Sequence, residues 1–430
     1  MPHLLLLLPT TTYRAEAFLS AARRLNLDVT VASDGATILK TQRPTEFLHL
    51  NFRDPDEASR DVVHVARQSP IDAVIGVDDP TTVLAAHLSA ALDLPHNDVA
   101  SVSAARNKHL MRQLLHRHGV PAPNFNVFPY DADPASLPRE ITFPCVVKPL
   151  ILSASCGVIR ANNPAEFEAA FRRVGALLTT LGLTAKEEAG RLILVEDFMP
   201  GGEVALEGLL MAGTLRVLAL FDKPDPLDGP FFEETIYVTP SRLPDRTQQE
   251  IAVCAQAAAQ ALGLREGPMH GEFRVNDQGV WVVELAARSI GGQCSRTLRF
   301  ATDLSLEELI LRHALRMPLP LLERARGAAG VMMLPIPSRG IFREVRGQED
   351  ARRVPGIEEL TITARPGEEL VPLPEGTRYL GFLIARGEMP DAVEKALREA
   401  HRRLTVVLHS ESAGERRHPP PPARPGVETF

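Results

Sequence analysis

The first hundred residues alternate between continuous apolar runs and segments with helical periodicity. The apolar runs are HLLLLL at 3–8, DVTVAS at 28–33 and DAVIGV at 72–77, and the helical segments are YRAEAFLSAARRLN at 13–26 and TTVLAAHLSAALD at 81–93. Strands that read as uninterrupted apolar runs are typical of a parallel sheet covered by helices on both faces. The pattern therefore predicts a parallel α/β domain over residues 1–102.

Proline and glycine mark where this alternation ends. The helical segment at 107–119 is followed by the break VPAPNF, and GAAGVMMLPIPSRGIF at 327–342 opens a strand-rich portion that closes with one more amphipathic helix. We therefore expect a central α+β region over 103–325 and a small α+β C-terminal domain over 326–411. The residues that follow, 412–430, are charged and Pro-rich, and they are predicted to be disordered.

Composition and charge exclude several classes of partner. The chain is 44% hydrophobic and 23% charged, with a formal net charge of −7, so no large surplus of either sign predicts binding to nucleic acid or to a membrane surface. The N-terminal leucine run is too short for a signal peptide, and no run approaches the roughly 18 apolar residues that span a membrane. The four cysteines lack metal-type spacing, which favours reduced thiols in a cytoplasmic protein.

Several common catalytic motifs are absent from the sequence. There is no G-x-x-x-x-G-K-[ST], no G-x-G-x-x-G after the first strand, no H-E-x-x-H and no G-x-S-x-G. The HGE triplet at 270–272 has the form found in zinc deaminases, but no P-C-x-x-C accompanies it. These absences argue against P-loop, dinucleotide-binding, metalloprotease and serine-hydrolase chemistry.

Two glutamates flank a predicted hairpin in PMHGEFRVNDQGVWVVELAAR at 268–288. Glu272 and Glu284 are symmetric about Gln278, so a three-residue loop from Asp277 to Gly279 would set them opposite each other, with Val282 on the face of Glu284. Like charges directly opposite are destabilising, so a positive charge should lie between them. A pair of carboxylates suits Mg²⁺, although an exposed hairpin with solvated glutamates is the alternative for an isolated pair.

Two further segments carry groups that suit a nucleotide. ITFPCVVKPLILSASCGV at 141–158 delivers Lys148 from an apolar strand into a loop of small residues, whose backbone N–H groups can approach phosphate oxygens. LILVEDFMPGGEV at 192–204 places Glu196 at a strand end and Glu203 beyond a glycine turn. These glutamates could bind an adenine amino group and ribose hydroxyls, or they could be solvated loop residues.

Taken together and in this order, the segments resemble the ATP-grasp superfamily, whose members activate a carboxylate with ATP. The resemblance implies an α/β, ATP-grasp fold preceded by the parallel α/β domain and followed by the small α+β domain, with a lid over about 140–205. It implies ATP and Mg²⁺ as cofactors, with Mn²⁺ as an alternative ion. Lys148 and Arg288 would be catalytic, and Glu272 and Glu284 would bind the metal. The implied nucleotide-binding residues are Lys108, Lys148, Ser153, Ser155, Gly157, Glu196, Asp197, Met199 and Glu203.

The E-x-A-A-R form of the second glutamate strand is similar to that of the L-amino-acid ligases. Many ATP-grasp enzymes carry Asn as a further metal ligand where this chain has Ala286, which leaves the number of bound ions open. Within DGPFFEETIYVTPSRLP at 228–244, the resemblance assigns Glu234 and Tyr237 to the amino-acid pocket, Tyr237 standing where His is common. Arg288 would contact the transferred phosphoryl group or the acyl phosphate. Because Gly292 has no side chain, we also expect room beside it for a larger substrate side chain.

The resemblance implies an ATP-dependent carboxylate–amine ligase that makes an amide between amino acids or peptides through an acyl phosphate, releasing ADP and phosphate. A homodimer is a further expectation. Two alternatives remain open at this point: an ATP-grasp ligase that uses another nucleophile, such as a sugar amine or a thiol, and a nucleotide-binding protein without turnover.

Overall fold

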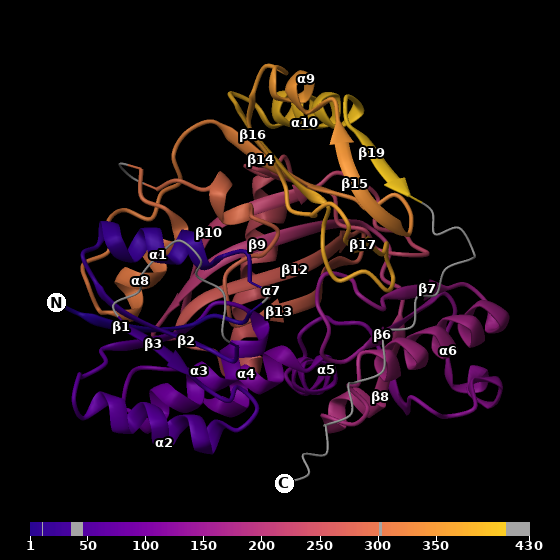
Figure 1. The fold of residues 1–430 in the computed structure, drawn as a ribbon. Coiled ribbons are helices and arrows are strands. Elements are labelled where there is room, and N and C mark those ends of the chain that lie inside the picture. The colour runs from indigo at the N-terminus through magenta and orange to yellow at the C-terminus, as the bar shows by residue number, and fades with distance from the viewer. Residues whose placement is uncertain (11, 36–45, 301–302, 410–430) are drawn as a thin grey trace, which may run out of the picture.

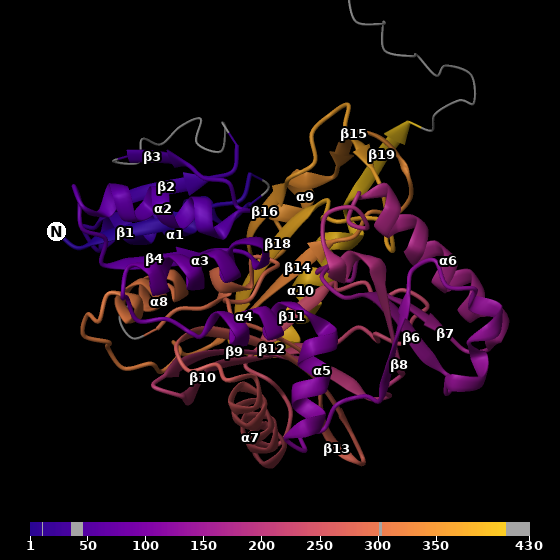
Figure 2. The same ribbon diagram turned by 90° about the horizontal axis from the view of Figure 1, so that it is seen from below.

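The computed structural model describes residues 1–10, 12–35, 46–300 and 303–409. Within these ranges the strands form four sheets, and Figure 1 shows the N-terminal sheet and the sheet that contains β6 and β8 on opposite sides of the largest sheet. Figure 2, seen from below, shows the same arrangement. The predicted disordered tail over 412–430 lies outside the described residues.

The N-terminal sheet is parallel, as the sequence predicts, with the order β3-β2-β1-β4. Its first strand is buried on both faces, because Leu4 and Leu6 pack in one apolar cluster and Leu5 and Leu7 in another. The elements are β1 (His3–Leu7), α1 (Ala15–Arg24), β2 (Asp28–Ser33), β3 (Glu46–His49), α2 (Pro55–Ala66), β4 (Ala73–Gly76) and α3 (Asp79–Ala91). The sequence analysis missed β3 and α2, which are short or mostly polar.

A second, antiparallel sheet has the order β5-β8-β6-β7 and its own apolar core, into which α6 packs Phe167, Phe171 and Val174. The elements of this part are α4 (Val99–Arg106), α5 (Lys108–Arg117), β5 (Phe125–Pro129), η1 (Pro134–Ser136), η2 (Pro138–Glu140), β6 (Cys145–Pro149), β7 (Ile159–Ala161), α6 (Pro164–Thr180), η3 (Glu188–Arg191) and β8 (Leu192–Asp197). A separate core lets this sheet behave as a unit distinct from the sheet beside it.

The largest sheet has the order β13-β12-β9-β10-β11-β14-β18-β16 in the described residues. Alternate residues of β9 enter different cores: Val204 and Leu206 pack with α5 and α7, whereas Ala205 and Leu209 pack toward the N-terminal sheet and α8. The elements are β9 (Gly202–Met211), β10 (Thr214–Lys223), β11 (Ile236–Thr239), α7 (Asp245–Leu262), β12 (Gly267–Asn276), β13 (Gly279–Ala286), η4 (Cys294–Thr297) and α8 (Leu306–Ala314).

The C-terminal portion contributes strands to this same sheet. Its elements are β14 (Ala328–Leu334), β15 (Gly340–Arg346), α9 (Gln348–Arg352), β16 (Ile357–Ile362), β17 (Glu369–Leu370), β18 (Gly381–Gly387), α10 (Pro390–Arg402) and β19 (Thr405–His409). β14 pairs with β11 across the predicted limit at 325, while β15, β17 and β19 form a small separate sheet. The domain limits therefore stay a prediction, and the hydrogen bonding of the largest sheet continues across one of them.

None of the helices in the described part of the chain combines the length and apolar character needed to cross a membrane.

Candidate active site

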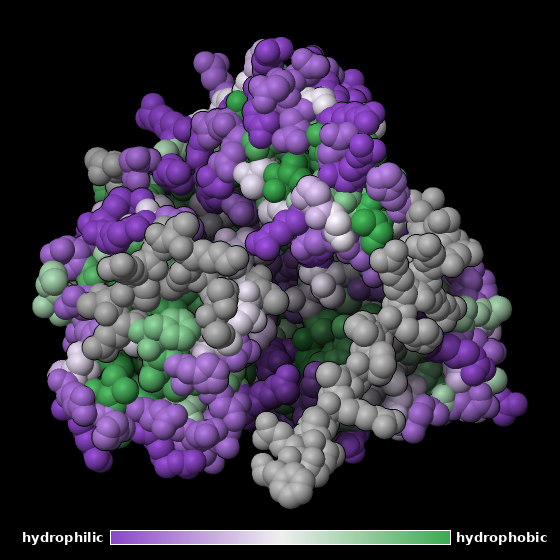
Figure 3. Space-filling model, in the orientation of Figure 1, coloured by the Kyte–Doolittle hydropathy of each residue, from purple (hydrophilic) through white to green (hydrophobic). Residues whose placement is uncertain are grey.

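The predicted site residues meet in one cavity of about 900 Å³ between the N-terminal sheet, the β5–β8 sheet and the C-terminal portion. The face seen in Figure 3 is hollowed at its centre. The predicted residues that line the cavity are Lys108, Lys148, Ser153, Ser155, Glu196, Asp197, Met199, Glu203, Glu234, Tyr237, Glu272, Glu284, Arg288 and Gly292. Gly157 is the exception, because its N–H turns away and donates to the carbonyl of Pro374 at 2.7 Å.

The two glutamates of the hairpin are opposite each other, but the predicted loop is wrong. Asn276 pairs with Gly279, so the turn contains two residues, and the register shifts between Glu272 and Phe273. Val283 is the extra residue of this bulge, because Phe273 pairs with Val282 while Glu272 pairs with Glu284. Val282 is consequently buried in the core, and the prediction that it shares a face with Glu284 is also wrong.

The positive charge next to Glu272 comes from Lys223, at the end of β10. Its ammonium lies 2.7 Å from Glu203, 2.9 Å from Glu234 and 2.8 Å from Glu272. Burial acts to lower the pKa of Lys223, but the three carboxylates outweigh it and hold this pKa well above its usual value. Burial likewise acts to raise the pKa of Glu272, and Lys223 holds it well below its usual value instead. Sequence reasoning missed Lys223, which reads only as a lysine that ends an apolar strand.

Lys108, the first residue of α5, balances the second glutamate. Its ammonium lies 3.0 Å from Glu284 Oε1 and donates to the carbonyl of Leu152 at 2.8 Å, so it joins the hairpin to the small-residue loop. The side chain of Asn107 caps this helix by accepting from the N–H groups of His109 and Leu110, and this cap fixes the position of Lys108 at the start of the helix. The facing carboxylates are therefore each paired with a lysine.

Glu196 is held by two buried cations. It forms an ion pair with Lys148 and a second with Arg112, at 3.0 Å, and Arg112 also donates to the carbonyl of the bulge residue Val283 at 2.7 Å. Burial acts to raise the pKa of Glu196, but Arg112 and Lys148 keep it below its usual value. Burial, assisted by the neighbouring Arg112, lowers the pKa of Lys148 despite the attraction of Glu196. Arg112 was missed, because an arginine in an amphipathic helix is usually exposed.

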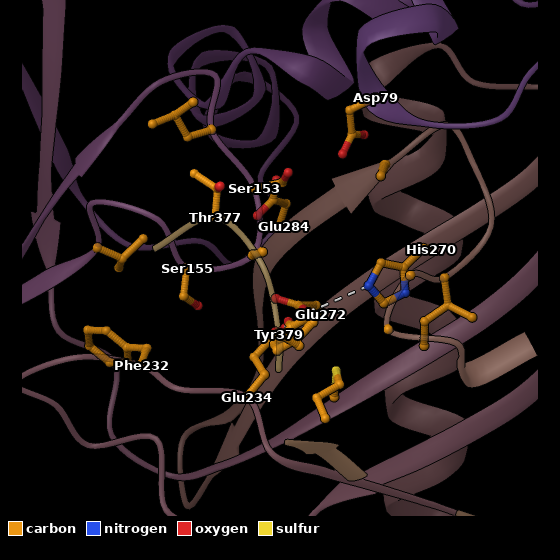
Figure 4. Close-up of a pocket in the computed structure, with 18 of the residues that line it drawn as sticks. Asp79, Ser153, Ser155, Phe232, Glu234, His270, Glu272, Glu284, Thr377 and Tyr379 are labelled. Atoms are coloured by element: carbon orange, nitrogen blue, oxygen red, sulfur yellow. Dashed lines mark hydrogen bonds and ion pairs between the residues drawn. The ribbon is translucent and has the colours of Figure 1, made fainter. Parts of the chain in front are cut away.

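The loop after β6 departs from ordinary backbone conformations. Ala154 and Ser155 have φ values of 54° and 55°, and Gly157 has a φ of 73°. Residues with side chains rarely adopt this left-handed region, so two of them in succession, Ala154 and Ser155, indicate a loop whose shape is held by its surroundings. In Figure 4, Ser153 and Ser155 lie on the side of the cavity where Glu284 is seen.

Arg288 reaches across the cavity to the N-terminal domain. Its Nε–H and one Nη2–H donate to the two carboxylate oxygens of Asp79, each at 2.8 Å. Burial acts to lower the pKa of Arg288, but the carboxylate of Asp79 outweighs burial and holds this pKa above its usual value. Sequence reasoning missed Asp79, because the DDP triplet that contains it reads as the start of a helix.

The expected amino-acid pocket joins Glu234 to the C-terminal portion. Tyr379 donates its hydroxyl to Glu234 at 3.1 Å, and the Tyr237 hydroxyl lies 3.5 Å from Glu272. Burial raises the pKa of Glu234, and Glu272 adds to this effect while Lys223 opposes it. Figure 4 shows Glu234, Tyr379 and Glu272 gathered at one end of the cavity, with Asp79 toward the other.

The room expected beside Gly292 is filled. Gly292 has a φ of 59°, and a Cβ placed on it would lie 2.5 Å from Met333 Sδ. The N–H of Gly292 donates to the hydroxyl of Tyr13 at 2.7 Å. The prediction of free space at this position is therefore wrong, because Met333 of β14, a strand distant in sequence, occupies it.

Three family models match the chain: ATP-grasp N-terminal domain over residues 19–96, ATP-grasp domain over 141–297 and L-amino acid ligase C-terminal domain 2 over 332–409. An uncharacterized protein of Sinorhizobium fredii is 24% identical over 386 residues, which cover 89% of this chain and 78% of that protein. An alanine–anticapsin ligase of Bacillus subtilis is 26% identical over 270 residues, which cover 60% of this chain and 56% of the ligase.

The fold is similar to a solved structure over nearly its whole length. The crystal structure of an L-amino acid ligase from Bacillus licheniformis superposes with a TM-score of 0.83 and 26% sequence identity, covering 95% of this chain and 99% of that one.

Proposed function

We propose that the chain joins two amino acids, because it belongs to the ATP-grasp superfamily, carries the C-terminal domain of the L-amino acid ligases and is similar to ATP-dependent, amide-forming ligases. The carboxylate of one amino acid would react with the amine of a second amino acid or a short peptide, and ADP and phosphate would be released. One observation carries this proposal: Lys108, Lys148 and Arg288 face a single cavity that ends at the Glu234–Tyr379 pair.

ATP would lie along the side of the cavity formed by β6, β8 and the loop between β6 and β7. Both carboxylate oxygens of Glu196 are engaged by Arg112 and Lys148, and the N–H groups of Asp197 and Phe198 donate to the carbonyls of Asn124 and Pro144. The Met199 N–H and the neighbouring backbone would therefore hydrogen-bond adenine.

Glu203 lines the cavity and accepts one hydrogen bond on each oxygen, from Lys223 and from Arg274, so it would take the ribose hydroxyls with its remaining lone pairs. Lys108 and Lys148 would take the phosphates. The loop from Ser153 to Gly157 would cover the phosphates. The N–H groups of Cys156 and Gly157 donate to the carbonyls of Ser153 and Pro374, so the first residues of the loop would supply the N–H groups that meet the phosphates.

The residues present fit a magnesium ion at the hairpin. The contacts of Glu272 and Glu284 with described residues engage only Oε1 of each carboxylate, which leaves both Oε2 atoms available. Hard carboxylate oxygens suit Mg²⁺, and they suit Mn²⁺ as a substitute. When bound, the ion would offset negative charge on the phosphates of ATP. Ala286 supplies no further ligand.

The chemistry would run in two displacements. An oxygen of the first substrate's carboxylate attacks the γ-phosphorus, the bond to the departing ADP oxygen breaks, and an acyl phosphate forms. The amine of the second substrate then attacks the acyl carbon and loses a proton, while phosphate leaves with the electrons of the broken C–O bond. Lys148 and Arg288 would stabilise the transferring phosphoryl group, and Glu234 would bind a substrate ammonium.

The enclosure of the cavity would protect the acyl phosphate from water. The loop over the phosphates is held against the C-terminal segment, because Gly157 donates to Pro374 and the Cys156 thiol lies 4.0 Å from the carbonyl of Glu375. Exclusion of water until the amine arrives favours amide formation over hydrolysis.

The test is an ADP-release screen with Mg²⁺ and ATP across amino acids, singly and in pairs, followed by mass spectrometry of the products. ADP release that requires a particular pair, with a new amide of the expected mass, supports the proposal, as does a hydroxamate when hydroxylamine is added. ADP release without any new amide favours another nucleophile. ATP binding without ADP release under every condition favours a protein without turnover.

Replacing either glutamate of the hairpin tests the metal assignment. Glu272→Gln and Glu284→Gln should each lower ADP release by about 100-fold or more, since each removes a charged ligand from the ion. Glu250→Gln, on the exposed face of α7, is the control and should keep the wild-type rate. Wild-type rates for both hairpin variants at saturating Mg²⁺ would contradict the assignment of these glutamates as metal ligands.

We also propose that the protein forms a homodimer, on the basis of its resemblance to related enzymes alone. Light scattering coupled to size-exclusion chromatography measures the molar mass in solution and so tests this directly.

A further inference from the structure

The backbone around Arg288 is fixed by polar contacts from two other parts of the chain. Arg14 donates to the Ser289 carbonyl at 3.3 Å and to its hydroxyl. The N–H of Ile290 donates to the buried carboxyl of Glu207 at 2.8 Å. Together with the Tyr13 contact to Gly292, these bonds hold the segment from Ser289 to Gly292 without using the Arg288 side chain.

The guanidinium of Arg288 is held separately, by Asp79. Two of its five N–H groups donate to the carboxylate of Asp79, and a third, on Nη1, donates to the Ser289 carbonyl at 3.0 Å. For the remaining two N–H groups, the described residues supply no acceptor. These two belong to Nη1 and Nη2, and a planar guanidinium can present such a pair to two oxygens of one phosphoryl group.

Asp79 is free for this task because another residue caps its helix. Asp79 is the first residue of α3, and Asp78 stands at the N-cap, where its N–H donates to the Thr81 hydroxyl at 3.3 Å. The carboxylate of Asp79 lines the cavity, and Figure 4 shows it pointing into the open space. Asp79 directly precedes Pro80, whose fixed φ limits how far the backbone can move at this point.

We propose that Asp79 is a positioning residue for Arg288: its carboxylate orients the guanidinium so that the two unengaged N–H groups meet the transferring phosphoryl group. This inference rests on the proposed function, which supplies the phosphoryl group.

Competing carboxylates explain why the guanidinium needs a fixed partner. Asp78 and Glu284 also attract Arg288, and Glu284 is a proposed ligand of the metal ion. Without Asp79, these two carboxylates would draw the guanidinium away from its productive orientation. A displacement of about 1 Å in such a group can cost about 100-fold in rate.

The test compares Asp79→Asn and Asp79→Ala with a matched control. Asp56→Asn changes an exposed aspartate in the first turn of α2, one position further into its helix than Asp79 in α3 and absent from the lining of the cavity. We expect kcat for ADP release to fall about 10-fold in Asp79→Asn and about 100-fold in Asp79→Ala, with the KM for ATP and the unfolding temperature little changed. Asp56→Asn should behave as wild type.

A double variant separates positioning from a general structural effect. If Asp79 acts through Arg288, Asp79→Ala combined with Arg288→Lys should be no slower than Arg288→Lys alone, because the second change removes what the first one disturbs. Multiplicative losses in the double variant, or a wild-type kcat in Asp79→Ala, would overturn the inference.

The failure of the proposed function gives a different result. In that case the wild type releases no ADP with any amino acid offered, and positioning is then judged by calorimetry with ATP and ADP alone. An equal loss of the preference for ATP over ADP in Asp79→Ala and Arg288→Lys supports the inference, and an unaltered preference in Asp79→Ala contradicts it.

Discussion

Lys223 is the residue on which three carboxylates of the site depend. Its side chain is only 3% exposed, and Glu203, Glu234 and Glu272 surround its ammonium. We expect Lys223→Met to destabilise the protein by about 3–5 kcal/mol at neutral pH, because it leaves the buried Glu234 and Glu272 without their lysine, while Glu203 keeps only Arg274. Denaturant unfolding measures this loss. Lys395→Met, on the exposed face of α10, is the control.

The loss should depend on pH. In the wild type, Lys223 keeps the pKa of Glu272 below that of the unfolded chain, so this contribution is present at neutral pH and is lost as the pH falls. In Lys223→Met the pKa values of the unpaired carboxylates should rise above the unfolded value of about 4.3, so their penalty grows as the pH rises through that value. The difference in stability between the two proteins should therefore shrink toward acidic pH. A constant difference would contradict this account.

Met333 is expected to limit the size of one substrate side chain. It fills the space next to Gly292 and lines the cavity. Met333→Ala should shift the preference among amino-acid pairs toward bulkier side chains, at a cost of about 2–5 kcal/mol in stability. Competition between small and large substrates, read by mass spectrometry, measures the shift. Met333→Leu conserves volume and should keep the original preference; an unchanged preference in folded Met333→Ala would refute this role.

Sequence reasoning found the side chains of the site better than it found their partners. Lys148, Glu272 and Arg288 stand in recognisable local patterns, whereas Lys223 and Asp79 are recognisable only by what folding brings beside them. The local pattern around a residue reports its own strand or helix. It carries no information on which distant strand will supply the opposite charge.

The loop between β6 and β7 depends on one glycine. Gly157 has a φ of 73°, and a Cβ on it would lie 2.8 Å from Pro149 Cγ. Gly157→Ala should destabilise the protein by at least about 1–2 kcal/mol and raise the KM for ATP, because the loop must move to relieve both problems. Gly182→Ala is a matched control, since its φ of 65° carries the same backbone cost but only the flexible end of Lys186 lies nearby. Equal KM values for the two variants would separate this loop from ATP binding.

Among the helices and strands, the alternation of the N-terminal domain was predictable because each buried strand carries an uninterrupted apolar run. The bulge at Val283 was not predictable. A single extra residue in a strand leaves no mark in the apolar pattern, since Val282 and Val283 are equally apolar. The facing of Glu272 and Glu284 was therefore expected for the wrong geometrical reason.

The largest sheet joins the central and C-terminal portions into one folding unit. β11 pairs with β10 through a single residue pair, Asp222 with Val238, but with β14 through four. A chain that ends at residue 325 should therefore lose β11 and expose Ile236 and Val238, which are buried in the C-terminal core. We expect this truncated chain to be insoluble, and the full chain to unfold without a stable intermediate that lacks only the C-terminal portion. Solubility and denaturant unfolding measure both; a soluble, folded 1–325 fragment would contradict the expectation.

The strand pairing across residue 325 was invisible in the sequence, because a Pro/Gly-rich break looks the same between domains as between strands of one sheet.

The walls of the cavity come from widely separated parts of the chain, and Tyr379, near the end of this series, donates to Glu234. A ribosome makes Lys108, Lys148 and the glutamate hairpin, the proposed nucleotide and metal ligands, long before it makes Tyr379, and chains fold from the N-terminus as they emerge. A nascent chain therefore holds the groups that attract ATP before it can enclose a substrate. Because β11 pairs mainly with β14, we expect Tyr237 and the adjoining Glu234 to reach their final positions only when the C-terminal strands have left the exit tunnel. The order of translation would then delay ATP consumption until the polypeptide can complete the reaction.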